Sequence, residues 1–93
     1  MDRERALDML TRLVEVPTQN PPGEGCEECA GLLADWLRSA GLRVREVRVP
    51  NSDPPRVIVV GEAGSGRPLY LHGHYDVVPG SPEQFVALSL IHI

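Results

Sequence analysis

The hydrophobic pattern of the chain changes its period at Gly41, and this change sets the fold class. Before Gly41, apolar residues recur at intervals of three and four in two segments, which is the spacing of amphipathic helices with one buried face. After Gly41 they alternate or run together in short stretches that are typical of strands. The order helix, helix, strand, strand, strand predicts a single small α/β domain for the 93 residues.

Both predicted helices carry recognisable end signals. Asp2 is the expected N-cap of the first helix, which should end near Val16 because Pro17 disfavours the α conformation in the residue before it. The second helix follows a turn at residues 18–23 and stops at Gly41, where a left-handed C-cap belongs. The two apolar stripes comprise Leu7, Leu10, Leu13 and Val14, and Cys26, Cys29, Ala30, Leu33, Trp36, Leu37 and Ala40.

Three strands are expected after the helices. In the first strand, Val44 and Val47 fall on opposite parities, which predicts a β-bulge near Arg45 and Glu46. Residues 57–60 form an unbroken β-branched run, typical of a strand buried on both faces. Residues 69–74 are the predicted third strand.

Charge and composition exclude several classes of protein. The formal net charge is -4, and the nine arginines are spread from Arg3 to Arg67 without a basic cluster, which argues against nucleic acid as a partner. No apolar run reaches the roughly 18 to 20 residues that a membrane span needs. The charged N-terminus lacks the apolar core of a secretory signal, and two cysteines are too few for a secreted disulfide scaffold. We therefore expect a cytoplasmic protein without a membrane partner.

The strongest candidates for chemistry are His72, His74 and Asp76, at the end of the predicted third strand. In an extended chain, residues two apart lie on the same side at about 7 Å, so an imidazole and a carboxylate can converge. A metal-binding histidine generally donates its other ring hydrogen to a carboxylate or carbonyl, and Asp76 could accept it from His74. The alternative is that both histidines are structural and that Asp76 caps a turn.

Cys26 and Cys29 have the Cys-x-x-Cys spacing of zinc knuckles and redox sites. Both lie on the apolar stripe of the second helix, so packing is their expected role. A small non-catalytic zinc-binding module that uses Cys26, Cys29, His72 and His74 is an alternative function, and a metal-free packing domain is another. Residues 61–66 are glycine-rich but lack the Gly-Lys-Ser/Thr of a phosphate-binding loop, so a connecting loop is expected.

Two strings in the sequence stand out: residues 13–23 read LVEVPTQNPPG and residues 69–79 read LYLHGHYDVVP. Together they resemble the start of the M20 metallopeptidase family, and the Gly-His-x-Asp-Val-Val-Pro part is the more specific. This family includes acetylornithine deacetylase, succinyl-diaminopimelate desuccinylase, aminoacylases and related carboxypeptidases. The resemblance covers the chain from about Ala6 to Phe85. It implies the N-terminal part of a zinc-exopeptidase-like domain.

The resemblance also implies an activity and a site. The family hydrolyses the amide bond of N-acyl amino acids or small peptides with two zinc ions, for which cobalt is an alternative. By this resemblance His74 is a metal ligand and Asp76 is the acid of the catalytic site that orients its imidazole. The family's other ligands, its base glutamates and its dimerisation domain come later in the chain, whereas only Glu83 and His92 follow Asp76 here as candidate ligands. We expect these 93 residues alone to be inactive and the full-length enzyme to be a homodimer.

The end of the chain departs from the family pattern. After Phe85 the family continues through a polar segment, whereas this chain is apolar, and residues 88–93 resemble translated sequencing-adapter sequence. We therefore expect residues 1–85 to belong to the M20-like catalytic domain and residues 86–93 to be a non-native tail. A native apolar strand is the alternative.

Overall fold

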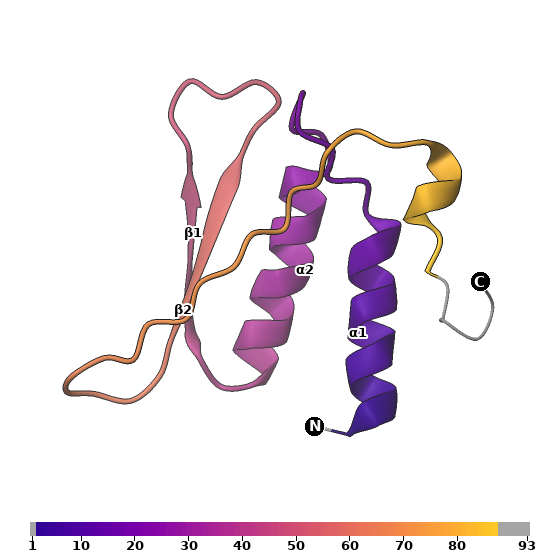
Figure 1. Cartoon of the computed structure of the whole chain (residues 1–93). Helices are drawn as coiled ribbons and strands as arrows, with labels where there is room; N and C mark the ends of the chain where they lie inside the picture. The colour runs from indigo at the N-terminus through magenta and orange to yellow at the C-terminus, as the bar shows by residue number, and fades with distance from the viewer. Residues whose placement is uncertain (1, 88–93) are drawn as a thin grey trace.

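The computed structural model describes residues 2–87 and is a small α/β arrangement of two helices and a two-stranded sheet (Figure 1). Its elements are α1 (Arg3–Glu15), α2 (Cys26–Ser39), β1 (Arg43–Arg48), β2 (Val57–Glu62) and a short 3-10 helix, η1 (Pro82–Phe85). The two strands are antiparallel. No helix in residues 2–87 is both long and apolar enough to cross a membrane.

The helix ends confirm the end signals read from the sequence. The side chain of Asp2 accepts a hydrogen bond from the backbone nitrogen of Arg5 at 2.8 Å, as an N-cap does. The helix ends at Glu15, two residues before Pro17. After α2, Gly41 has a φ of 91°, the left-handed conformation that glycine adopts without a steric penalty.

The predicted β-bulge is wrong. The register between β1 and β2 is continuous from Arg43 opposite Glu62 to Arg48 opposite Val57. Val44 lies opposite Gly61, where an added methyl would meet a Leu37 side-chain carbon of α2 at 3.1 Å, so these residues face α2. Regular alternation then places Val47 on the other face, where it is exposed. The apolar residues of β1 are therefore divided between two faces without a bulge.

The expectations for the other strands fail for a related reason. Residues 57–60 do form part of β2, but Ile58 is 53% exposed, so the strand is not buried on both faces. Within the described residues, α2 covers only one face of the sheet. Residues 69–74 belong to no strand; they form an exposed segment with Leu69, Tyr70 and Leu71 turned to solvent. Their hydrophobic pattern is typical of extended chain, but in the described residues no strand pairs with them.

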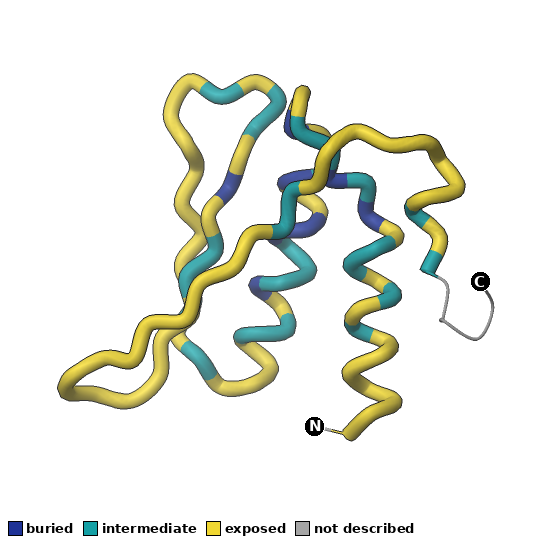
Figure 2. The backbone as a smooth tube through the Cα atoms, viewed as in Figure 1, coloured by how far each residue is buried: buried dark blue, intermediate teal, exposed yellow. Residues whose placement is uncertain are grey.

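The core lies around the first half of α2. Its buried apolar residues are Val16, Cys26, Cys29, Ala30, Ala34 and Val57, and Thr18 is the buried polar residue beside them. Figure 2 shows most of the buried positions where α2 begins and where the chain leaves α1, with others farther along α2 and in β2. The helix α1 has no buried residue of its own. The packed part of the molecule therefore includes the turn after α1, next to the candidate site.

Candidate functional site

The two strings that carry the family resemblance lie side by side in the structure. Gln19 and Val77 form an isolated parallel β-bridge. The backbone nitrogen of Val77 donates to the carbonyl of Thr18 at 2.8 Å, and the backbone nitrogen of Asn20 donates to the carbonyl of Val77 at 2.8 Å. We call these paired segments, residues 18–20 and 75–77, the backbone clamp. It brings together residues more than 50 positions apart in the sequence.

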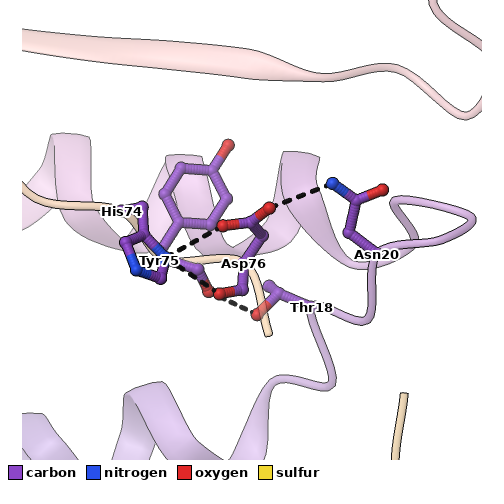
Figure 3. A network of polar contacts seen from close by, with 5 residues as sticks. All are labelled: Thr18, Asn20, His74, Tyr75 and Asp76. Carbon is purple, nitrogen blue, oxygen red and sulfur yellow. Dashed lines mark hydrogen bonds and ion pairs between the residues drawn. The ribbon is translucent and has the colours of Figure 1, made fainter. Parts of the chain in front are cut away.

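Side-chain hydrogen bonds of Thr18 and Tyr75 add to the backbone contacts of the clamp. Thr18 is 2% exposed, and its hydroxyl donates to the carbonyl of Tyr75 at 2.6 Å (Figure 3). The Tyr75 hydroxyl in turn donates to the carbonyl of Val57, at the start of β2. Burial raises the pKa of Tyr75 to about 12, so the phenol stays protonated and remains a donor. Tyr75, which lies between His74 and Asp76 in the sequence, is therefore hydrogen-bonded both to the turn after α1 and to the sheet.

His74 and Asp76 contact each other directly (Figure 3). The Nδ1 atom of His74 lies 3.0 Å from Oδ1 of Asp76 and 3.1 Å from the backbone carbonyl oxygen of the same residue. Both oxygens are acceptors, so the neutral ring carries its hydrogen on Nδ1 and keeps its lone pair on Nε2. The His74 side chain is 80% exposed and that of Asp76 is 42% exposed. A ligand arriving from solvent can therefore reach this ring.

Asp76 is held in its ionised form by its neighbours. Its Oδ2 atom accepts a hydrogen bond from Nδ2 of Asn20 at 3.0 Å. This hydrogen bond, followed by the interaction with His74, lowers the pKa of Asp76 below its ordinary value. One carboxylate oxygen thus faces Asn20 and the other faces His74, as the sticks in Figure 3 show.

The structure separates the other candidate residues from this site. The ring of His72 stacks on Tyr70, with 6.1 Å between ring centroids. Cys26 and Cys29 are buried, and burial raises the pKa of Cys29 to about 11, which disfavours the thiolate that binds metal. In residues 2–87 no three or more His, Cys, Asp or Glu residues gather as a metal site. The four residues of the alternative zinc module therefore do not form one.

The remaining candidate ligands, Glu83 and His92, follow Asp76 in the sequence. Glu83 is part of η1 and is exposed. His92 and residues 88–93 of the predicted non-native tail (residues 86–93) lie outside the described residues.

Three residues of the site had no role assigned from the sequence. Thr18 and Asn20 belong to the first string, but local spacing does not reveal that they contact Tyr75 and Asp76. Arg56 also takes part, since its Nη2 atom donates to Oδ1 of Asn20 at 3.0 Å. No local pattern marks Arg56, because its partner is 36 residues away.

No family model matches this chain, no curated protein matches it, and no solved structure matches it.

Proposed function

We propose that this chain is the N-terminal part of the catalytic domain of an M20-like, zinc-dependent amide hydrolase, to which it contributes one metal ligand and the carboxylate that orients it. The observation that carries the proposal is the contact between His74 and Asp76. The 3.0 Å hydrogen bond occupies Nδ1 and leaves Nε2 free on a ring that is 80% exposed. A carboxylate behind a ligating histidine is the usual arrangement at protein metal sites.

The donor atoms fit one ligand of a zinc site. When bound, two zinc ions would activate a water molecule for attack on the amide carbonyl. In this proposal His74 offers Nε2, and Asp76 fixes the ring and raises the basicity of that nitrogen. A catalytic zinc generally has three protein ligands. The proposal therefore places the other ligands and the general base in further polypeptide, beyond the described residues.

The proposed substrates follow from the resemblance alone. They are N-acyl amino acids or small peptides, cleaved at the amide bond by a cytoplasmic homodimer. Cobalt is the proposed alternative to zinc. The resemblance specifies neither the acyl group nor the amino acid.

The first test uses the 93-residue chain and zinc alone. Zinc should bind weakly, because one ligand is in place, and it should shift the NMR signals of the His74 ring. His74→Ala should abolish that binding, whereas the matched control His72→Ala should retain it. Zinc binding that persists in His74→Ala and disappears when Cys26 and Cys29 are replaced would contradict the proposal and favour the cysteine module.

The second test requires the reading frame continued past Phe85. That longer protein should hydrolyse N-acyl amino acids in a chelator-sensitive manner, whereas the 93-residue chain should not. Asp76→Asn in the longer protein should lower metal affinity or activity by about 10 to 100-fold, the usual effect of removing such an orienting group. Unchanged activity in its His74→Ala variant would refute the assignment of the ligand.

A further inference from the structure

We infer that Asn20 and Arg56 are positioning residues that help to keep the hydrogen of the neutral His74 ring on Nδ1. The inference deepens the proposed function and rests on it for its biological meaning, because a free Nε2 matters only if the ring binds a metal. The structural claim itself concerns only residues of this chain and can be tested without metal.

The observation is a continuous series of side-chain hydrogen bonds that ends at His74. Arg56 Nη2 donates to Asn20 Oδ1 at 3.0 Å, and Asn20 Nδ2 donates to Asp76 Oδ2 at 3.0 Å. The other carboxylate oxygen of Asp76 lies 3.0 Å from His74 Nδ1. We call these four residues the positioning chain. The hydrogen bonds converge on Asp76: Arg56 and Asn20 donate toward it from one side, and the His74 ring donates to it from the other.

The chemistry of Arg56 and Asp76 fixes the orientation of the Asn20 carboxamide between them. A guanidinium can only donate hydrogen bonds, and an ionised carboxylate can only accept them. The residue between Arg56 and Asp76 must therefore present an acceptor on one side and a donor on the other. The Asn20 carboxamide does this in one of its two flipped orientations. An aspartate at position 20 would lose the donor and would place a second negative charge beside Asp76.

Arg56 is itself held in place from several directions. Its backbone nitrogen donates to the Ser52 hydroxyl at 3.0 Å, and its carbonyl accepts from the backbone nitrogen of Val49 at 2.9 Å. Its Nη2 atom also donates to the carbonyl of Pro22 at 3.0 Å. The guanidinium lies close over Gly23, where an added methyl would stand 2.7 Å from Arg56 Nε. The connection between β1 and β2 therefore reaches the site through this side chain.

The backbone carbonyl of Asp76 limits the size of the expected effect. It lies 3.1 Å from His74 Nδ1 and remains an acceptor when the carboxylate moves. Loss of Asn20 or Arg56 therefore frees only one of the two Asp76 acceptors, the carboxylate, to move away from Nδ1. We expect a partial change in the balance between the two neutral ring forms.

The test is nitrogen-15 NMR of the His74 ring in the metal-free 93-residue chain, at a pH where the ring is neutral. A hydrogen held on Nδ1 gives two well-separated ring nitrogen shifts, and exchange between the two neutral forms brings these shifts closer together. The separation should narrow in Asn20→Asp and in Arg56→Met. Arg56→Lys should restore most of it, because an ammonium group also donates, and the control Arg67→Gln should leave it unchanged.

The outcomes separate this inference from the proposed function. An unchanged separation in both Asn20→Asp and folded Arg56→Met would overturn the inference, whatever zinc does. Arg56 is at the surface, so Arg56→Met keeps the test valid if Asn20→Asp fails to fold. Narrowed separation in a chain whose His74 takes up no zinc would support the positioning chain and contradict the proposed function. An equal narrowing in Arg67→Gln would overturn the inference, since it would show a general loss of positive charge.

Discussion

Tyr75→Phe should lower the free energy of unfolding by about 1 to 2 kcal/mol, because it deletes one hydrogen-bond donor and keeps the ring. The hydroxyl of Tyr75 donates to the carbonyl of Val57, a residue that is only 6% exposed. A net intramolecular hydrogen bond contributes about 0.5 to 1.5 kcal/mol, and a buried acceptor left without a partner costs about 1 to 3 kcal/mol. The expected loss of about 1 to 2 kcal/mol is toward the lower end of these two ranges because Tyr75 itself is only half-buried.

Urea unfolding measures this change. With a urea dependence of about 1 to 2 kcal/mol per molar, the midpoint of Tyr75→Phe should fall by roughly 1 M. The chain contains one other tyrosine, Tyr70, which is 80% exposed and supplies a matched control. Tyr70→Phe should change the free energy of unfolding by less than about 0.5 kcal/mol.

Alkaline pH provides an independent check on the same contact. Burial raises the pKa of Tyr75 from 10.0 to about 12, so the fold favours the protonated phenol. The resulting stabilisation is complete below pH 10 and is lost as the pH rises through 12. The difference in unfolding free energy between the unmodified chain and Tyr75→Phe should therefore shrink across this interval.

Three results would refute this reasoning. The first is a Tyr75→Phe variant as stable as the unmodified chain at neutral pH. The second is an equal destabilisation in Tyr70→Phe. The third is a stability difference that stays constant through pH 12, which would show that the Tyr75 phenol is not held protonated by the fold.

Further variants test the packing around α2. Gly31→Ala should stabilise the chain by about 0.5 to 1 kcal/mol in a thermal melt, because Gly31 lies inside a helix and an added methyl meets nothing within 4 Å. Gly61→Ala should destabilise it by about 1 to 3 kcal/mol, since its methyl would meet leucine carbons at 3.1 Å; equal melting temperatures for these two variants would contradict both assignments. Replacing Cys26 and Cys29 together by alanine should reduce stability modestly and leave zinc uptake unchanged, and loss of zinc by elemental analysis would show that the cysteines bind it.

Local signals in the sequence were sufficient to predict the helices. The Asp2 cap, the stop before Pro17 and the left-handed Gly41 each act within a few residues of themselves, and the structure has all three. The sheet was harder, because a strand pattern does not reveal what covers each face. Val47 and Ile58 are apolar residues on the face of the sheet that α2 does not cover, so both the bulge predicted from Val47 and the burial predicted for Ile58 were wrong.

In the candidate site too, local contacts could be predicted from the sequence and long-range contacts could not. The contact between His74 and Asp76 could be anticipated, because the two residues are only two positions apart in extended chain. The contacts of Asp76 with Asn20, and of Asn20 with Arg56, could not, because they join residues 56 and 36 positions apart. Such contacts depend on how the chain returns on itself, which periodicity does not encode.

The lack of any buried residue in α1 has a consequence for local unfolding. Opening of α1 exposes little additional apolar surface, and a helix of 13 residues is marginal in water without tertiary packing. Its amide hydrogens should therefore exchange with solvent faster than those of α2, whose Cys29, Ala30 and Ala34 are buried. Val16 and Thr18, which follow the end of α1, are buried. The backbone clamp therefore belongs with α2 to the more protected cooperative unit. The helix can open while the residues around His74 keep their arrangement.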